Sequence, residues 1–157
     1  DNHYGSPSHG IDLIPKPTNG RLPMLITGSS QQNDRWLAEH GDGWMLYPRD
    51  LNDQQKIVEA WRERTKNAGR TIKPAMQPLY IDLSNNAHSK PKPIHLGFQL
   101  GIEALKEYLV ALEEAGINHV AINLRFNKAP IEETLQLLAE QLLPRFNANE
   151  ENTKECA

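Results

Sequence analysis

The short segment Gly28-Ser29-Ser30 combines residue types that suit the binding of an anion. Glycine allows the backbone to approach a ligand closely because it has no side chain. The two serine hydroxyls can donate hydrogen bonds, and free backbone N–H groups at the start of a helix attract negative charge. The segment therefore favours a phosphate-sized anion, although a turn followed by a serine helix cap explains the same residues without a ligand.

The segments around this turn indicate how the chain positions it. Residues 23–27 form a short apolar run that predicts a buried strand, and residues 36–38 predict a helix after the serines. Residues 43–47 predict a second strand. Strand, turn, helix and strand together make a βαβ unit with two parallel strands side by side. We therefore expect the turn at the carboxyl end of the first strand.

Three further residues, Tyr47, Ser84 and Arg125, are expected at the same end of the sheet as Gly28. Tyr47 ends the second predicted strand, and Arg125 follows the predicted strand 119–124. In barrels of parallel strands, active sites lie at the carboxyl ends of the strands. Arg125 can bind a phosphate or an anionic substrate there, or it can pair with a helix carboxylate such as Glu132 or Glu133.

The rest of the sequence predicts a regular alternation of strands and helices. Residues 1–22 predict a lead-in loop, in which residues 12–14 can form a brief strand. The remaining predictions are a helix from Asp50 or Asn52 to Gly69, a strand at 75–83, a long loop at 84–99, a helix at 102–116, a strand at 119–124, a helix at 130–142 and a disordered tail at 147–157.

The predicted alternation indicates an α/β fold with a parallel sheet and helices outside it. The four β-α units correspond to half of a (β/α)8 barrel, which takes about 250 residues when complete. Four strands can also make a small open sheet, and hydrophobic periodicity does not separate the two. The chain starts at Asp1 without a methionine, which we interpret as the middle of a longer protein.

Composition limits the classes of function. The net charge of -3 and the pI near 6.1 argue against a nucleic-acid-binding surface, which is usually basic. The sequence contains no apolar run of about 20 residues and no signal-peptide pattern, so we expect no membrane span and a cytoplasmic protein. The histidines lack metal-ligand spacing and Cys156 is the one cysteine, so no metal site is expected. His88 and His95 lie in the predicted long loop and are candidate lid residues.

The segment GSSQQNDRWLAEHGDGWMLYPR, residues 28–49, resembles the bacterial luciferase-like, flavin-dependent oxidoreductases. That family shows a strand that begins with proline, a Gly/Ser turn, and a helix ending in Ala-x-x-(Gly or Ala)-Asp-Gly-Trp. The matching residues are Ala38, Gly41, Asp42, Gly43 and Trp44, of which we expect the last three to fix the turn and the core. The segments QPLYIDLS, PIHLGFQLG and HVAINLRF resemble one bacterial subgroup, so the similarity runs from about residue 11 to 146.

The resemblance implies that residues 1–146 form the C-terminal half of a TIM barrel. The N-terminal half of the barrel, or a second copy of the chain, is then expected as partner. The cofactor is expected to be FMN, with a deazaflavin as alternative. The cofactor-binding residues implied are Gly28, Ser29, Ser30, Gln31, Tyr47 and Arg125.

The activity implied is that of a monooxygenase that uses reduced FMN and oxygen on a small-molecule substrate. The alternatives are a deazaflavin-dependent hydride-transfer enzyme and a non-catalytic flavin-binding or structural half-barrel. A flavin reductase is a candidate partner of the monooxygenase. The resemblance assigns no catalytic residue in this chain, because the missing half supplies much of the family's flavin-ring pocket.

Overall fold

The computed structural model describes residues 14–69 and 73–147, which form an α/β fold around one mixed sheet that does not close on itself. The four strands predicted from the sequence are β1 (Leu25–Thr27), β2 (Gly43–Met45), β3 (Ala75–Leu83) and β6 (His119–Asn123). They pair in parallel, β1 with β2, β2 with β3, and β3 with β6. The prediction of parallel neighbouring strands is therefore confirmed.

The predicted helices are also present, and their ends follow local capping signals. They are α1 (Asp34–His40), α2 (Leu51–Asn67), α3 (Ile102–Glu114) and α4 (Ile131–Gln141), followed by a short helix α5 (Leu143–Asn147) that the sequence analysis did not predict. The Asp50 carboxylate accepts a hydrogen bond from the Asp53 amide at 3.1 Å, so Asp50 is the N-cap of α2. Gly69 follows α2 with a φ of 69°, a conformation that favours glycine after a helix end.

The prediction of a long loop at residues 84–99 is wrong. This segment contains an antiparallel hairpin of β4 (Lys92–Ile94) and β5 (Gly97–Leu100), and β5 also pairs in parallel with the end of β3. Pro93 is tolerated because β4 is an edge strand. Gly97 is required because a Cβ there would lie 1.8 Å from the Tyr80 carbonyl oxygen. The hairpin interrupts the predicted strict alternation of strands and helices.

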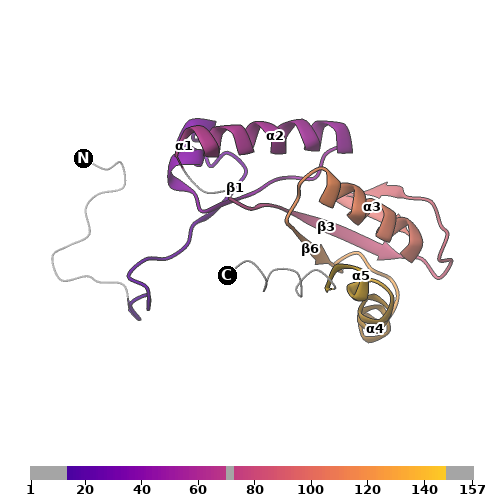
Figure 1. Ribbon diagram of the computed structural model, residues 1–157. Helices are drawn as coiled ribbons and strands as arrows, with labels where there is room; N and C mark the ends of the chain where they lie inside the picture. The colour runs from indigo at the N-terminus through magenta and orange to yellow at the C-terminus, as the bar shows by residue number, and fades with distance from the viewer. Residues whose placement is uncertain (1–13, 70–72, 148–157) are drawn as a thin grey trace.

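The helices pack through one core cluster against one face of the sheet, and Figure 1 shows α1 and α2 beside the start of β3 and α3, α4 and α5 around its other end. Alternate residues of β3 are buried on this face, namely Ala75, Gln77, Leu79, Ile81 and Leu83. Each of the helices α1 to α4 contributes to one core cluster with the apolar residues of this set, through Leu37, Val58, Leu105 and Leu138. The strand register places Thr27, Met45 and Met76 in a row on the opposite face. Among the described residues no helix covers that face.

Two predictions fall wholly or mainly outside the described residues. They are the brief strand at 12–14, of which Ile14 alone is described and lies in an exposed bend, and the disordered tail at 147–157, of which Asn147 alone is described and ends α5. Of the predicted lead-in loop, residues 14–22 are described and contain no helix or strand.

Candidate functional site: the β1–α1 turn

The Gly28 peptide is held against strand β2. Its N–H donates to the Met45 carbonyl at 2.9 Å, and its carbonyl accepts a hydrogen bond from the Trp44 indole Nε1 at 2.7 Å. Gly28 has a φ of 58°, which few other residues adopt without strain. A Cβ at this position would lie 3.2 Å from Cε2 of Tyr47. The sequence-predicted residues Gly28 and Tyr47 therefore lie in contact at the carboxyl ends of neighbouring strands.

The two residues after Ser29 are also left-handed. Ser30 has a φ of 46° and Gln31 a φ of 59°, which is uncommon for residues other than glycine. Within the described residues, no acceptor takes a well-formed hydrogen bond from the amides of Ser29, Ser30 or Gln31. Successive backbone amides in turns that combine right- and left-handed residues can form a concave anion site. Strained backbone at an exposed turn is also typical of functional sites.

The expectation that the serines lead directly into a helix needs correction. Helix α1 begins at Asp34, and Asn33 is its N-cap, with Oδ1 accepting from the Trp36 amide at 2.9 Å. The Asp34 carboxylate lies in the first turn and pairs with Arg64 at 3.2 Å. Because Asn33 and Asp34 already occupy this helix end, its dipole is not available for a phosphate as predicted. The turn amides are the remaining backbone donors.

The two serine hydroxyls differ in their surroundings. The Ser30 hydroxyl donates to the Thr27 carbonyl at 3.1 Å, which stabilises the turn itself. The Ser29 side chain is exposed, and no hydrogen bond of its hydroxyl to another described residue is present. Ser29 is therefore the better placed of the two to donate to a ligand, and Gln31 is exposed beside it.

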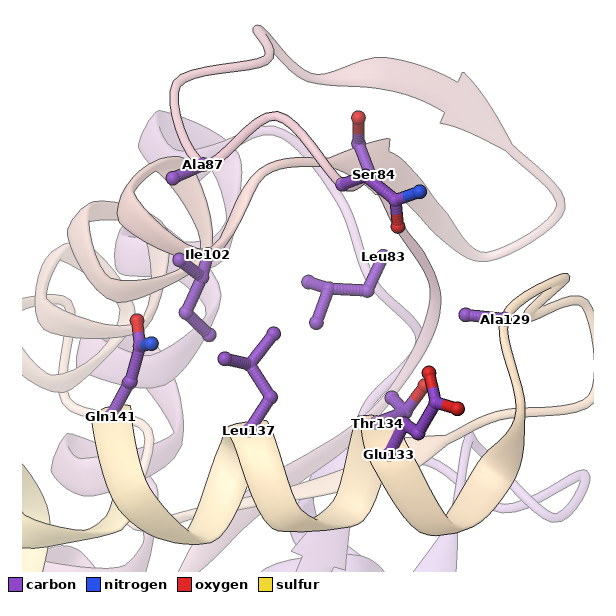
Figure 2. Close-up of a pocket in the computed structure, with 10 residues that line it drawn as sticks. Leu83, Ser84, Ala87, Ile102, Ala129, Glu133, Thr134, Leu137 and Gln141 are labelled. Carbon is purple, nitrogen blue, oxygen red and sulfur yellow. The ribbon is translucent and has the colours of Figure 1, made fainter.

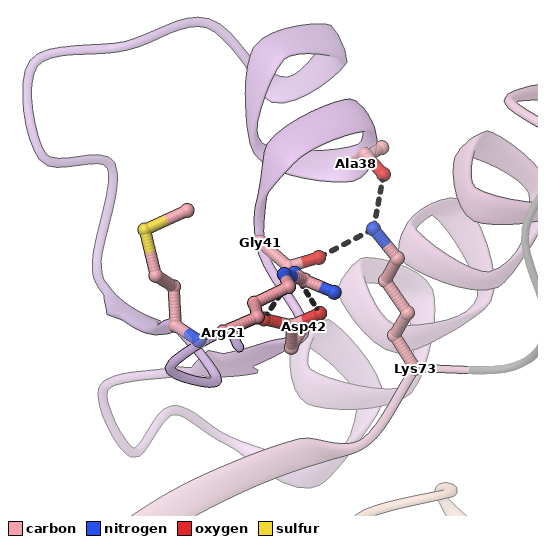
Figure 3. A network of polar contacts seen from close by, with 6 residues as sticks. Arg21, Ala38, Gly41, Asp42 and Lys73 are labelled. Carbon is pink, nitrogen blue, oxygen red and sulfur yellow. Dashed lines mark hydrogen bonds and ion pairs between the residues drawn. The ribbon is translucent and has the colours of Figure 1, made fainter. Parts of the chain in front are cut away.

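The Asp-Gly-Trp residues fix the strands below this turn, as expected from the sequence. Asp42 accepts hydrogen bonds from the Met24 amide at 2.7 Å and from the Arg21 guanidinium (Figure 3). The Met24 amide and then Arg21 hold the pKa of the Asp42 carboxyl below its ordinary value. A Cβ at Gly43 would lie 2.9 Å from Leu25 Cδ2 and 3.0 Å from Pro74 Cγ, so a side chain there would displace these neighbours.

A buried lysine completes this structural network. The ammonium of Lys73 donates to the carbonyls of Ala38, at 2.6 Å, and of Gly41, at the end of α1 (Figure 3). A cation at a helix C-terminus stabilises the last carbonyls of the helix. Lys73 therefore ties the start of β3 to the end of α1, below the turn.

The four residues predicted at one end of the sheet do not lie at the same position along the strand direction. Met45 pairs with Met76, near the start of β3, and β3 continues to Leu83. At about 3.3 Å per residue, Ser84 therefore lies about 20 Å further along the sheet than Tyr47.

Arg125 belongs to the further end of the sheet. Its backbone amide donates a hydrogen bond to Asn123 Oδ1 at 2.9 Å. Its guanidinium lies 5.8 Å from the centre of the Phe126 ring. Within the described residues no ion pair joins it to Glu132, Glu133 or another carboxylate. The alternative of a structural pair with α4 is therefore absent, and Arg125 does not contact the turn residues.

An aromatic cluster at this further end was not predicted. The rings of Tyr80, His95 and Phe126 lie with centroids 5.3 to 6.3 Å apart. They come from β3, the β4–β5 turn and the segment after β6, so no local pattern connects them. This contact places His95 against the sheet and does not support its predicted role as a lid residue.

A pocket of about 280 Å³ lies beside this end, between β3, α3 and α4 (Figure 2). Its apolar side is formed by Leu83, Ile102 and Leu137, and Glu133 and Thr134 line it from α4. It contains none of the predicted cofactor-binding residues. The part of the chain that the structure describes contains no group of three potential metal ligands. Among the same residues, no helix is long and apolar enough to cross a membrane.

Comparison with known proteins identifies the family. The family model described as luciferase-like monooxygenase matches residues 2–81, which is just over half of the 157 residues. The chain belongs to this family. The matched segment of the luciferase-like chain includes β1, the turn, Trp44 and Tyr47, and it ends before Asp82 and Arg125. Membership places the chain in an oxidoreductase and monooxygenase superfamily whose fold is a TIM barrel.

Curated relatives of this luciferase-like chain come from mycobacteria. The uncharacterized protein Rv0953c of Mycobacterium tuberculosis and the uncharacterized protein Mb0978c of Mycobacterium bovis are each 31% identical to it over 68 residues. The aligned segment is 43% of this chain and 24% of each relative. The chain therefore aligns with about a quarter of the length of the curated relatives it matches.

Proposed function

We propose that this chain binds the phosphate of FMN in a luciferase-like monooxygenase that acts on a small-molecule substrate with reduced FMN and oxygen. The observation that carries the proposal is the left-handed turn of Gly28, Ser30 and Gln31, which lies inside the segment that matches the family. A turn of this conformation is unfavourable by itself, and an anion that binds its amides would offset the strain.

The donor set of the turn fits a phosphate. The amides of Ser29, Ser30 and Gln31 and the Ser29 hydroxyl are the donors, and Gly28 keeps the surface beside Tyr47 open. Hydrogen bonds to a charged acceptor contribute about 1.5–3 kcal/mol each. The Asp34 carboxylate would repel an anion, but its pairing with Arg64 at 3.2 Å reduces that repulsion.

The rest of the cofactor would lie over the face of the sheet that carries no helix. FMN supplies the redox chemistry when it is bound, and the protein binds it, orients it and excludes water. We propose that the parallel strands β1, β2, β3 and β6 are four of the eight strands of a TIM barrel, completed by the N-terminal half of the same barrel or by a second copy. Arg125, at the further end of the sheet, is in this proposal an anion-binding residue for a part of the cofactor or substrate other than the phosphate at the turn.

A deazaflavin cofactor remains the alternative within the same superfamily. The visible absorption spectrum of the purified complete protein separates the two, because FMN and a deazaflavin absorb at different wavelengths. Consumption of NADH through a partner flavin reductase would distinguish an enzyme from a cofactor-binding protein without turnover.

The phosphate proposal is tested by titrating the complete protein with FMN and with riboflavin, which lacks the phosphate. We expect Ser29→Ala to raise the Kd of FMN about tenfold, because a charge-assisted hydrogen bond is lost, and to leave the Kd of riboflavin unchanged. Ser30→Ala should have a smaller direct effect on phosphate binding, since its hydroxyl donates to Thr27. Gly28→Val should abolish the preference for FMN, because the side chain would meet Tyr47 and the φ of 58° is unfavourable for valine.

Ser89→Ala is a suitable control, because Ser89 bonds Ser84 at the further end of the sheet. It should change neither affinity. Equal losses for FMN and riboflavin in Ser29→Ala and Gly28→Val, or no loss for either ligand, would show that the turn binds no phosphate.

A further inference from the structure

The side chain of Trp44 connects the core to the candidate phosphate turn. Its indole ring is half-buried and packs on Trp61, with 5.2 Å between the ring centroids. Its Nε1–H donates to the Gly28 carbonyl at 2.7 Å. Trp44 therefore has a second role beside core packing, because the indole nitrogen forms a hydrogen bond with the backbone of the turn.

The hydrogen bond acts on the peptide unit that contains the first donor of the turn. The Gly28 carbonyl and the Ser29 N–H belong to one planar peptide, in which the two groups point in opposite directions. An indole donor that holds the carbonyl on the core side therefore directs the Ser29 N–H away from the core. The same bond polarises the peptide, and a polarised N–H is a stronger donor.

Strand β2 holds the other end of the same residue. The Gly28 N–H donates to the Met45 carbonyl at 2.9 Å, so Gly28 is fixed on both sides by residues next to each other in β2. Because glycine has the widest conformational freedom of all residues, its backbone needs such contacts to keep one conformation. The left-handed Ser30 and Gln31 follow directly after this fixed point.

We propose that Trp44 is a positioning residue for the phosphate turn, and that its indole N–H orients the Ser29 amide toward the bound anion. This inference rests on the proposed phosphate site. It separates two roles of Trp44, the packing of its ring in the core and the hydrogen bond to Gly28. A purely structural tryptophan would support both FMN and riboflavin binding equally, whereas a positioning residue acts on the phosphate.

The test compares Trp44→Phe with Trp61→Phe in the complete protein. Both changes remove an indole N–H that donates to a backbone carbonyl, because Trp61 Nε1 donates to the Lys73 carbonyl at 3.2 Å. Trp61 lies in the same core but does not touch the turn. We expect Trp44→Phe to raise the Kd of FMN about three- to tenfold without changing that of riboflavin. Trp61→Phe should leave the ratio of the two affinities unchanged.

A second substitution keeps the test valid if Trp44→Phe folds poorly. Incorporation of 3-benzothienylalanine at position 44 replaces the N–H by sulfur and keeps the shape of the ring system. It should reproduce the selective loss of FMN affinity. In ¹H–¹⁵N spectra of the unmodified protein, inorganic phosphate should shift the Ser29 amide signal, and this shift should weaken when the indole donor is absent.

The outcomes distinguish the two proposals. If the unmodified protein prefers FMN over riboflavin and both changes at position 44 keep that preference, the role of Trp44 is wrong and the phosphate site stands. If Trp61→Phe lowers the preference as much as Trp44→Phe does, the effect is one of core packing and the inference is also wrong. If the unmodified protein shows no preference for FMN, the phosphate site and the inference both fail.

Discussion

The Asp82 carboxylate is buried at the further end of β3 and is held by hydrogen bonds from two directions. It accepts from the Lys128 amide at 3.1 Å, from the Lys128 ammonium at 3.0 Å and from Gln99 Nε2 at 2.7 Å. Burial opposes ionisation, but these donors outweigh it and lower the pKa of Asp82 below its ordinary value. The ionised carboxylate therefore joins β3, β5 and the segment after β6.

Protonation of Asp82 should destabilise the fold. Because its pKa is lower in the folded state, its contribution is complete above the unfolded-state pKa of about 3.9 and is lost as the pH falls below that value. We expect Asp82→Asn to lower the free energy of unfolding at pH 7 by about 1.5–3 kcal/mol. The variant should also lose less stability than the unmodified protein between pH 5 and about pH 3. Denaturant unfolding at a series of pH values measures both effects.

Lys128→Met is the matched control for this prediction. The Lys128 side chain is 79% exposed, so the loss of its charge should change the free energy of unfolding by less than about 1 kcal/mol. The Lys128 amide would still donate to Asp82. An Asp82→Asn variant whose unfolding depends on pH as steeply as that of the unmodified protein would show that Asp82 is not the group responsible.

At the scale of elements, the sequence predicted those features that depend on neighbouring residues. The caps at Asp50 and Pro130 and the apolar spacing of α3 and α4 are local signals, and these helices lie where expected. The start of α1 was misplaced because Ser29, Ser30 and Asn33 are all good cap formers. Only the tertiary turn at Gly28, held by Trp44 and Met45, decides among them.

The β4–β5 hairpin and the aromatic cluster depend on contacts between distant segments. Lys90-Pro91-Lys92-Pro93 is typical of a loop, and nothing near it shows that β5 pairs with β3. The clue in the sequence is Gly97, whose missing side chain allows the Tyr80 carbonyl to lie against it. Tyr80, His95 and Phe126 meet only because this pairing forms, so their cluster was not predictable from spacing.

Gly97→Ala should therefore displace the hairpin from the sheet. The new Cβ would lie 1.8 Å from the Tyr80 carbonyl oxygen, so β5 must move away from β3. We expect a loss of about 3 kcal/mol in the free energy of unfolding, at the upper end of the effect of overpacking. Gly69→Ala is the control, because its φ is 69° but no atom lies within 4 Å, and it should cost about 1–2 kcal/mol. Equal losses in the two variants would contradict the close pairing of β3 and β5.

At the largest scale, the helices among residues 14–69 and 73–147 pack on one face of the sheet and leave its other face without a helix. Within the described residues, the outer edges of β1 and β6 pair with no strand, and Met24 and Leu25 are 47% and 52% exposed. Open strand edges and apolar surface of this kind favour association with another polypeptide. This arrangement supports the proposal that the remaining half of a barrel, or a second copy, covers the open face.

The 157-residue chain alone should therefore associate or expose apolar surface. We expect native mass spectrometry to show dimers or larger species, and a dye that binds apolar surface to fluoresce with the isolated chain. Addition of a polypeptide that supplies the proposed N-terminal half of the barrel should suppress the dye signal. A monomer of 17.8 kDa that melts cooperatively and binds no dye would contradict the proposal.

A crystal structure of the complete protein with FMN would locate the cofactor phosphate and is the most direct test of the proposed site. We expect phosphate oxygens about 2.7–3.2 Å from the amide nitrogens of Ser29, Ser30 and Gln31, with the Ser29 hydroxyl as a further donor. The Trp44 Nε1–H should still donate to the Gly28 carbonyl in that complex. A phosphate bound elsewhere, with this turn facing only water, would show that the proposed phosphate site is wrong.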